Sequence, residues 1–173
     1  MTIIKPQQTE FAPFYAGYID QVSTAGPVAL LENQLDAFDH LRKVPADQSE
    51  HRYSEGKWSV KELADHIADA ERVFAYRLLW IARADETPLA GFDENSWAKT
   101  APHATRRLAD VADELIAVRR ATIALVSSLD DAALSRTALA NNKLVSARAI
   151  CWIIPGHAEH HLQILRERYG VKV

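Results

Sequence analysis

The most informative stretch of the chain is Ile153-Ile154-Pro155-Gly156-His157-Ala158-Glu159-His160-His161-Leu162. Its apolar residues continue a three-and-four spacing that starts at Ile150 and extends to Leu165, as is typical of a helix with one buried face. His157 and His161 fall on this face, at positions where the pattern calls for leucine or isoleucine. The sequence therefore predicts a buried helix with two polar side chains on its apolar face.

The spacing of His157 and His161 suits a shared metal ion. Residues four apart on a helix face the same way, with Cβ atoms about 5–6 Å apart, and imidazole nitrogens bind zinc at about 2.0–2.1 Å. Buried polar groups need partners, and one ion would supply a partner to both rings. The alternative is that each histidine has its own hydrogen-bond partner in the core, and the spacing alone leaves both interpretations open.

Three further segments have the period of a long amphipathic helix, and no series of strands is apparent. One of them starts with a capping-box pair, Ser59 and Glu62. The expected helices run from near Thr24 to before Pro45, from Ser59 to Arg83, from Leu108 to Leu129 and from Ser146 to Tyr169. Four such helices favour an all-α fold, an antiparallel four-helix bundle with long connecting loops. We expect a single domain over residues 1–173.

The connections between the expected helices are long. Loops such as residues 84–105 and 130–145 are more often functional, or packed over a site, than idle. Trp97 in the first loop could line a pocket, and Asn141-Asn142 marks a turn in the second. The segment before the first helix holds aromatic residues that we expect to pack against the bundle, namely Phe11, Phe14, Tyr15 and Tyr18.

The composition is that of an ordinary globular protein, with 48% hydrophobic and 25% charged residues in a chain of 173. The formal net charge is −3 without a basic stripe, which argues against a nucleic-acid partner. No stretch approaches the roughly 18 apolar residues of a membrane helix, and the first residues lack a signal peptide's apolar run. The single cysteine, Cys151, cannot form an internal disulfide. We therefore expect a cytoplasmic protein without a membrane partner.

His66 is the best candidate for a third ligand. It lies beside Leu63 and Ile67, on the margin of the apolar face of the second expected helix. Three histidines with open positions are the arrangement of catalytic zinc sites, whereas structural sites have four protein ligands. His160 is rotated about 100° from His161 and is not expected to bind the same ion. The remaining histidines, His40, His51 and His103, are expected in solvent.

Several charged residues could support such a site. Glu62 and Asp69 lie one helical turn from His66 and could orient its ring, or they are ordinary solvated helix acids. Arg72 and Arg168 could bind an anionic substrate, or they form salt bridges with neighbouring acids. The motifs of zincins, di-iron bundles, phosphate-binding loops and serine nucleophile elbows do not occur, so no catalytic side chain can be named.

Four parts of the chain carry motifs of one known family. They are Gly56–Arg72, the motif Gly156–Leu162 followed by Arg166–Tyr169, the loop Asp85–Asp93 and the start Phe11–Tyr15. Together they resemble the DinB-like (damage-inducible) family over nearly the whole chain. The resemblance implies a four-helix bundle, often a homodimer, with a divalent metal ion held by three histidines. On the positions of this sequence those ligands are His66, His157 and His161.

The resemblance also implies a chemistry. The metal in this family is commonly zinc or nickel, and members with known chemistry are transferases or isomerases that use low-molecular-weight thiols, while others are described as hydrolases. We therefore expect a metal-dependent hydrolase or thiol-dependent transferase acting on a small molecule. The alternative is a non-catalytic, homodimeric, stress-related bundle in which the metal is structural. Pro155 stands where the family pattern calls for a small residue, and it could kink the helix and shift His157.

Overall fold

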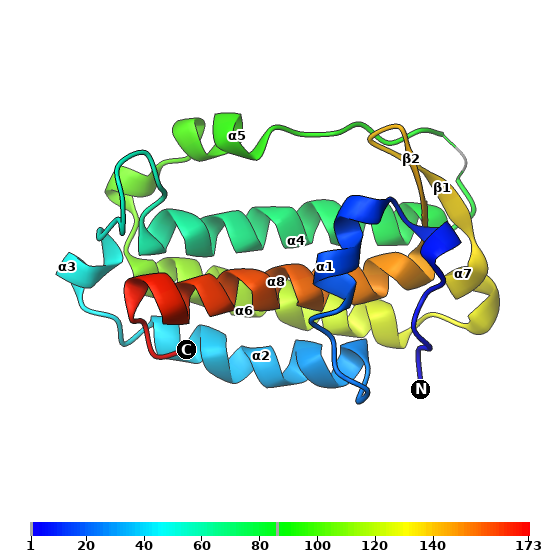
Figure 1. The fold of residues 1–173 in the computed structure, drawn as a ribbon, viewed down its shortest axis with the longest axis horizontal. Helices are drawn as coiled ribbons and strands as arrows, with labels where there is room; N and C mark the ends of the chain where they lie inside the picture. The colour runs from blue at the N-terminus through cyan, green and yellow to red at the C-terminus, as the bar shows by residue number, and fades with distance from the viewer. Residues whose placement is uncertain (1, 86) are drawn as a thin grey trace.

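A computed structural model describes residues 2–85 and 87–173, and four long helices dominate it (Figure 1). They are α2 (Pro27–Leu41), α4 (Val60–Ala82), α6 (Leu108–Ser127) and α8 (Ala147–Tyr169). These helices match the four expected segments, so the all-α four-helix bundle with long connections is confirmed. None of the described helices is both long and apolar enough to span a membrane.

The four helices form a ring in which α2 and α4 each pack against α6 and α8. The connection from α4 to α6, described at residues 83–85 and 87–107, returns along the length of the bundle, so α6 starts at the same end as α4 (Figure 1). As a result α4 lies antiparallel to its neighbour α8 and parallel to α6. The pairing of α4 with α8 matters most here, because these two helices carry all three candidate ligands.

The helix ends follow from local chemistry, and one of them, the start of α2, differs from the prediction. The capping box of α4 is confirmed, since the Glu62 amide donates to the Ser59 hydroxyl at 3.2 Å and the Ser59 amide donates to the Glu62 carboxylate at 2.7 Å. The expectation that the first helix begins near Thr24 is wrong. The N-cap is Gly26, whose φ of +87° favours glycine, and Pro27 starts α2 with its fixed φ.

A small hairpin, which the sequence pattern did not indicate, precedes α8. Strands β1 (Thr137–Ala140) and β2 (Lys143–Ser146) pair antiparallel. Asn141 and Asn142 form the expected turn with φ of 50° and 57°, the left-handed region that a two-residue hairpin needs. The remaining elements are short, namely η1 (Gln8–Glu10), η2 (Pro13–Tyr15), α1 (Ala16–Ile19), α3 (Ala46–Ser49), α5 (Glu94–Thr100), η3 (His103–Thr105) and α7 (Asp131–Ser135).

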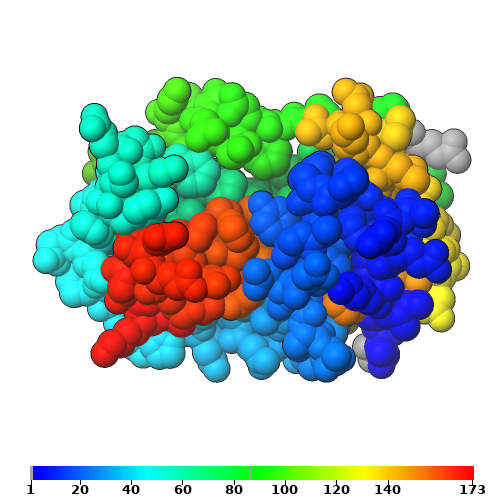
Figure 2. Space-filling model, in the orientation of Figure 1, coloured from blue at the N-terminus to red at the C-terminus, as the bar shows by residue number. Residues whose placement is uncertain are grey.

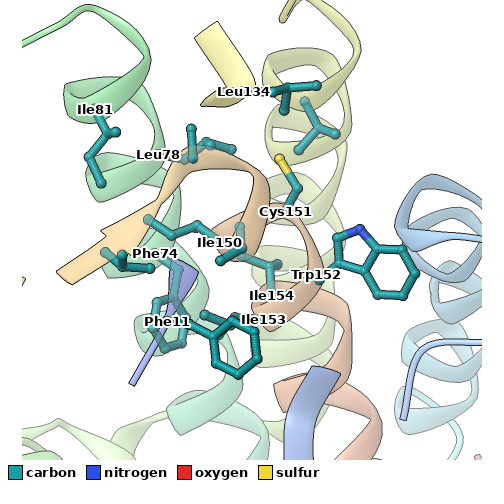
Figure 3. Close-up of a cluster of buried hydrophobic side chains, with 14 of the residues drawn as sticks. Phe11, Phe74, Leu78, Ile81, Leu134, Ile150, Cys151, Trp152, Ile153 and Ile154 are labelled. Atoms are coloured by element: carbon teal, nitrogen blue, oxygen red, sulfur yellow. The ribbon is translucent and has the colours of Figure 1, made fainter. Parts of the chain in front are cut away.

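Apolar side chains fill the interior along the whole bundle. Figure 3 shows the part in which Phe74 and Leu78 of α4 lie with Ile150 and Ile154 of α8. Each such buried side chain contributes roughly 1.5–3 kcal/mol to folding. Cys151 lies in the same cluster, and burial raises the pKa of its thiol to about 12. It is therefore a core residue and not a nucleophile.

The N-terminal segment packs across α8, as expected, and covers part of it on the face seen in Figure 2. Phe11 and Tyr15 are buried, whereas Phe14 is 59% exposed. Gly156 permits this contact, because a Cβ atom at that position would lie 1.9 Å from the backbone oxygen of Tyr18. The close approach brings the N-terminal aromatic residues next to His157, the neighbour of Gly156.

Candidate metal centre

Three histidines from two helices meet at one point of the bundle. His66 comes from α4, and His157 and His161 come from successive turns of α8. The Nε2 atom of His157 lies 3.2 Å from that of His66 and 3.1 Å from that of His161. The three potential ligand atoms all lie within 4.8 Å of one another. The structure thus brings together the three residues that the sequence singled out.

All three imidazoles are removed from bulk water. His157 and His161 are 6% and 9% exposed, and His66 is half-buried. Burial lowers the pKa of His66 to about 4, and it holds the pKa values of His157 and His161 well below their ordinary range, with a further contribution from the neighbouring imidazoles. At neutral pH each ring is therefore uncharged and has one nitrogen with a free lone pair.

Hydrogen bonds cannot satisfy this arrangement. A neutral imidazole nitrogen either carries a proton or has one lone pair, so Nε2 of His157 can form only one good hydrogen bond. Nε2 atoms of both His66 and His161 lie within hydrogen-bonding distance of it. Nitrogens bound at about 2.0–2.1 Å to a tetrahedral ion lie about 3.4 Å apart. The donor set and its spacing therefore fit one divalent metal ion.

Aromatic side chains pack against two of the three rings, His66 and His157. The ring of Tyr18 lies edge-on to His157, at 5.2 Å between centroids and an interplanar angle of 84°. The ring of Phe74 is 5.7 Å from His157, and the ring of Trp58 is 4.7 Å from His66. Packing therefore fixes the orientation of these imidazole rings, a role that a hydrogen-bonded carboxylate has at many metal sites.

Neither acid proposed to orient His66 contacts it. Glu62 caps α4 and pairs with Arg52, and Asp69 lies 3.6 Å from Arg72. The Nδ1 atom of His161 is buried and has no hydrogen-bond partner among the described residues. The alternative, that they are ordinary solvated helix acids, agrees with their lack of contact with His66, but the Glu62 side chain is only 15% exposed because it is held by the Ser59 amide and Arg52.

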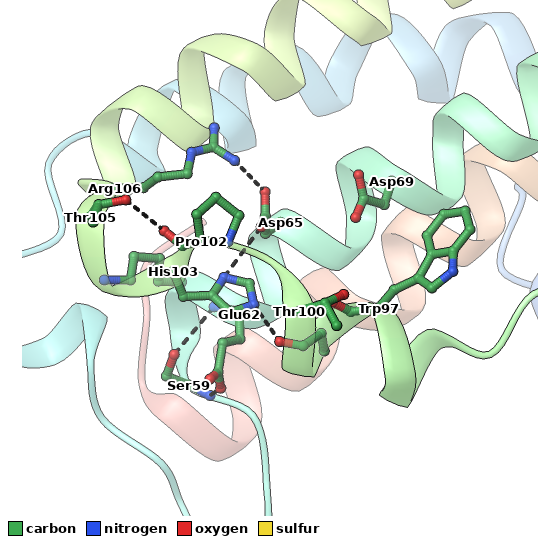
Figure 4. A network of polar contacts seen from close by, with 12 residues as sticks. Ser59, Glu62, Asp65, Asp69, Trp97, Thr100, Pro102, His103, Thr105 and Arg106 are labelled. Carbon is green, nitrogen blue, oxygen red and sulfur yellow. Dashed lines mark hydrogen bonds and ion pairs between the residues drawn. The ribbon is translucent and has the colours of Figure 1, made fainter.

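The expectation that His103 lies in solvent is wrong. Its Nδ1 atom is 3.3 Å from Asp65, and its Nε2 atom lies 2.9 Å from the carbonyl oxygen of Ala98 (Figure 4). This contact forms because the α4–α6 connection folds back on to α4, which the sequence pattern could not reveal. Arg72 pairs with Glu114 at 2.5 Å and does not reach the histidines. The remaining candidates are exposed, as expected for His40 and His51, and as found for Arg168.

Helix α8 runs unbroken through Pro155. Proline lacks the N–H that would continue the helical ladder, but His157 and His161 still face the same way, with ring centroids 4.5 Å apart. The Gln34 side chain of α2 donates to the Pro155 carbonyl at 2.9 Å and ties this turn to the bundle. Pro155 therefore does not break the helix or separate His157 from His161.

A cavity of about 330 Å³ is lined by all three histidines. Its walls also contain Arg77 of α4 and Asn141 of the β1–β2 turn, both of which sequence reasoning missed. One signal was available for Arg77, which lies three helical turns after His66 on the same side of α4. Trp97 lies at a smaller neighbouring cavity, where its ring is 4.7 Å from that of Phe92 and tilted by 38°.

Two curated proteins are similar to short stretches of this chain. Two curated relatives are named "Putative metal-dependent hydrolase", one from Geobacillus thermodenitrificans, 37% identical over 49 residues, and one from Oceanobacillus iheyensis, 40% identical over 47 residues. The first match covers 28% of this chain and 28% of the relative, and the second covers 27% of each. The chain thus matches less than a third of either relative's length.

A solved structure has the same fold. It is described as "YfiT from Bacillus subtilis", "a probable metal-dependent hydrolase with an unusual four-helix bundle topology". It matches 98% of this chain and 95% of its own chain, with a TM-score of 0.73 and 18% sequence identity. The model of the DinB superfamily matches residues 29–165. Because this match spans well over half of the sequence, the chain belongs to the DinB superfamily.

Proposed function

We propose that this protein binds one divalent metal ion through His66, His157 and His161 and acts as a metal-dependent hydrolase on a small molecule. The convergence of three Nε2 atoms beside a cavity carries the proposal. Three protein ligands leave coordination positions open, as in catalytic zinc sites. The descriptions of the two relatives and of YfiT support the same class of reaction.

The chain's own residues would prepare the site for this role. Burial keeps the imidazoles neutral, so that their lone pairs are free to bind. The aromatic walls reduce the contact of the cluster with bulk water, which strengthens electrostatic interactions inside. A divalent ion bound here would supply Lewis acidity, which promotes hydrolysis at neutral pH. The described lining of the cavity contains no serine or cysteine, in keeping with a reaction that uses no protein nucleophile.

A second cavity supports a catalytic role over a structural one. It measures about 230 Å³ and reaches His161 from the side of Trp58 and Tyr169. The cluster is thus accessible from two sides, whereas a structural ion is enclosed by four protein ligands. The second cavity also supports the other candidate, a transferase, because it offers room for a low-molecular-weight thiol beside the first substrate.

The finer parts of the proposal concern the metal and the assembly. Zinc and nickel are proposed because imidazole ligands suit both ions. A homodimer is proposed because four large apolar side chains of α4 and the hairpin are exposed, namely Tyr76, Leu79, Leu139 and Leu144. Light scattering should then give twice the mass of the chain, and a monomeric mass at micromolar concentration would contradict it.

Metal analysis of protein purified without a histidine tag tests the site. We expect about one equivalent of zinc or nickel in the wild type, almost none in His157→Ala, and wild-type content in the matched variant His160→Ala. Less than roughly half an equivalent of any transition metal, unchanged in His157→Ala, would exclude the three-histidine site.

Measurements of activity distinguish the three candidate roles, which are a hydrolase, a transferase and a bundle with a structural metal ion. A panel of ester and amide substrates should be cleaved by the metal-loaded protein, with loss after chelation and recovery on adding zinc or nickel. Turnover only in the presence of a thiol would favour the transferase. Metal removal that lowers the melting temperature without changing any turnover would favour the structural role.

A further inference from the structure

Arg77 is a buried cation. Its side chain is 4% exposed, and its Nη2 atom donates to the Ala90 carbonyl at 2.8 Å. Within the described part of the chain Arg77 forms no ion pair. Burial lowers the pKa of Arg77, because the guanidinium loses hydration. The Tyr15 hydroxyl lies close enough to raise this pKa in part. A buried charge is costly unless it is paired, so this arrangement calls for an anion from outside the chain.

The guanidinium lies at the same cavity as the histidines. The Phe74 ring lies near both groups, with its centroid 5.7 Å from the His157 ring and 5.9 Å from the Arg77 guanidinium carbon. Phe92 flanks the guanidinium on another side, at 6.0 Å. A short ligand lying along Phe74 could therefore reach both Arg77 and the histidine cluster.

The charges of the cavity restrict the anion. Arg77 is the basic residue of its described lining, apart from the neutral histidines, and Glu94 is the acid. The single guanidinium matches one negative charge, and the Glu94 carboxylate in the same wall repels further negative charge, so a carboxylate is favoured over a phosphate dianion. A guanidinium also matches the planar geometry of a carboxylate. The aromatic walls, formed by Tyr15, Phe74 and Phe92, suit a flat apolar body.

We propose that Arg77 binds a carboxylate of the substrate, so that the substrate is a small carboxylic acid with an apolar body whose reacting group lies at the histidines. The placement of the reacting group rests on the proposed function. The binding of a carboxylate by Arg77 does not, because it is argued from the burial and charge of Arg77 and from the other residues of the cavity, without the metal ion.

Binding of 4-phenylbutyrate and of the neutral 4-phenylbutyramide, measured by calorimetry, tests the proposal. We expect the wild-type protein to bind the carboxylate about tenfold or more tightly than the amide, as a charge-assisted hydrogen bond provides. Arg77→Gln should abolish this preference, and Arg77→Lys should keep part of it. The matched control is Arg72→Gln on the same helix, whose arginine pairs with Glu114, and it should keep the full preference.

Two outcomes would overturn the proposal, namely no preference in the wild type or an undiminished preference in Arg77→Gln. If Arg77→Gln does not fold, the wild-type protein gives the answer by NMR. The Nε–H signal of Arg77 should then shift on addition of 4-phenylbutyrate and not of the amide, and an unchanged signal would refute carboxylate binding there.

Metal content separates this proposal from the proposed function. Each titration is run on metal-loaded and on chelator-treated protein, so that a carboxylate bound to the ion is distinguished from one bound to Arg77. Arg77→Gln should retain the wild-type metal content. A wild type that binds no metal would sink the proposed function, while a preference that depends on Arg77 would still establish the carboxylate site.

Discussion

Two buried polar clusters of this bundle are built in opposite ways. In one, Arg119 of α6 donates to both carboxylate oxygens of Glu71, at 2.8 and 2.7 Å, and to the side-chain oxygen of Gln34. Its side chain is 0% exposed and lies 4.8 Å from the centre of the Phe38 ring. In the other, three imidazoles that are alike in chemistry face one another, and one nitrogen cannot satisfy both neighbours.

The difference shows what marks a candidate site. Gln34 extends the first cluster to α8, because its amide donates to the Pro155 carbonyl, so all four long helices are joined. Each of these donors has an acceptor, and this cluster needs nothing from outside the chain. In the histidine cluster, by contrast, Nε2 of His157 has two neighbouring nitrogens and can form a good hydrogen bond with only one of them. Buried polar groups that lack hydrogen-bond partners, rather than buried polar groups in general, therefore mark the candidate site.

The largest effect is expected from breaking the satisfied cluster. Arg119→Met leaves the Glu71 carboxylate buried without its cation, which should lower the free energy of unfolding by about 3–5 kcal/mol. Urea denaturation measures it. The double variant with Glu71→Met should recover part of the loss because no buried charge remains. A single-variant loss below about 1 kcal/mol would show that the ion pair is not buried in solution.

Gly156→Ala should disturb the turn that lies between the two clusters. Its Cβ would meet the Tyr18 backbone oxygen at 1.9 Å, so α1 must shift, at a cost of about 1–3 kcal/mol in unfolding free energy. Tyr18 would move away from His157, and the metal content should fall. Gly17→Ala is the matched control, because nothing lies within 4 Å of its Cβ position. Equal stability of the two variants would contradict the close contact.

Acid should destabilise the metal-free protein through its histidines. The unfolded chain binds a proton at His66 below pH about 6.5, whereas the folded chain does so only near pH 4. Stability should therefore fall as the pH drops from about 6.5 towards 4, by up to about 1.4 kcal/mol per pH unit for this residue. Denaturation between pH 7 and pH 5 measures the slope, and His66→Gln should flatten it. An identical slope in His66→Gln would show that the ring is not buried in its neutral form.

The smallest effect on stability is expected at the histidine cluster, and it tests directly whether the two clusters differ. His157→Leu in the metal-free protein should change the unfolding free energy by less than about 1 kcal/mol, because an apolar side chain replaces an unsatisfied polar one. The same variant should bind no metal. A loss as large as that of Arg119→Met would mean that the histidines form a satisfied structural network, and the contrast between the clusters would disappear.

Much of the fold could be predicted from the sequence because its signals are local. The capping box of Ser59 and Glu62 and the turn at Asn141-Asn142 appear where expected. The hairpin strands were missed because four-residue strands are too short for a clear period. The start at Thr24 was wrong because Gly26 can adopt the backbone conformation that the turn needs. The single domain over residues 1–173 and the ligand role of the histidines remain predictions.

By itself the sequence determined that His157 and His161 share one face of a helix, since a four-residue spacing fixes this wherever the helix lies. Only the tertiary structure decided that His66 meets them, because this depends on α4 packing antiparallel to α8. It also decided the surroundings of Arg77, which on an isolated helix would be hydrated. Contacts from Tyr15 and Ala90, remote in sequence or in a loop, remove that water. Periodicity is a property of neighbouring residues, whereas burial depends on every segment that packs nearby.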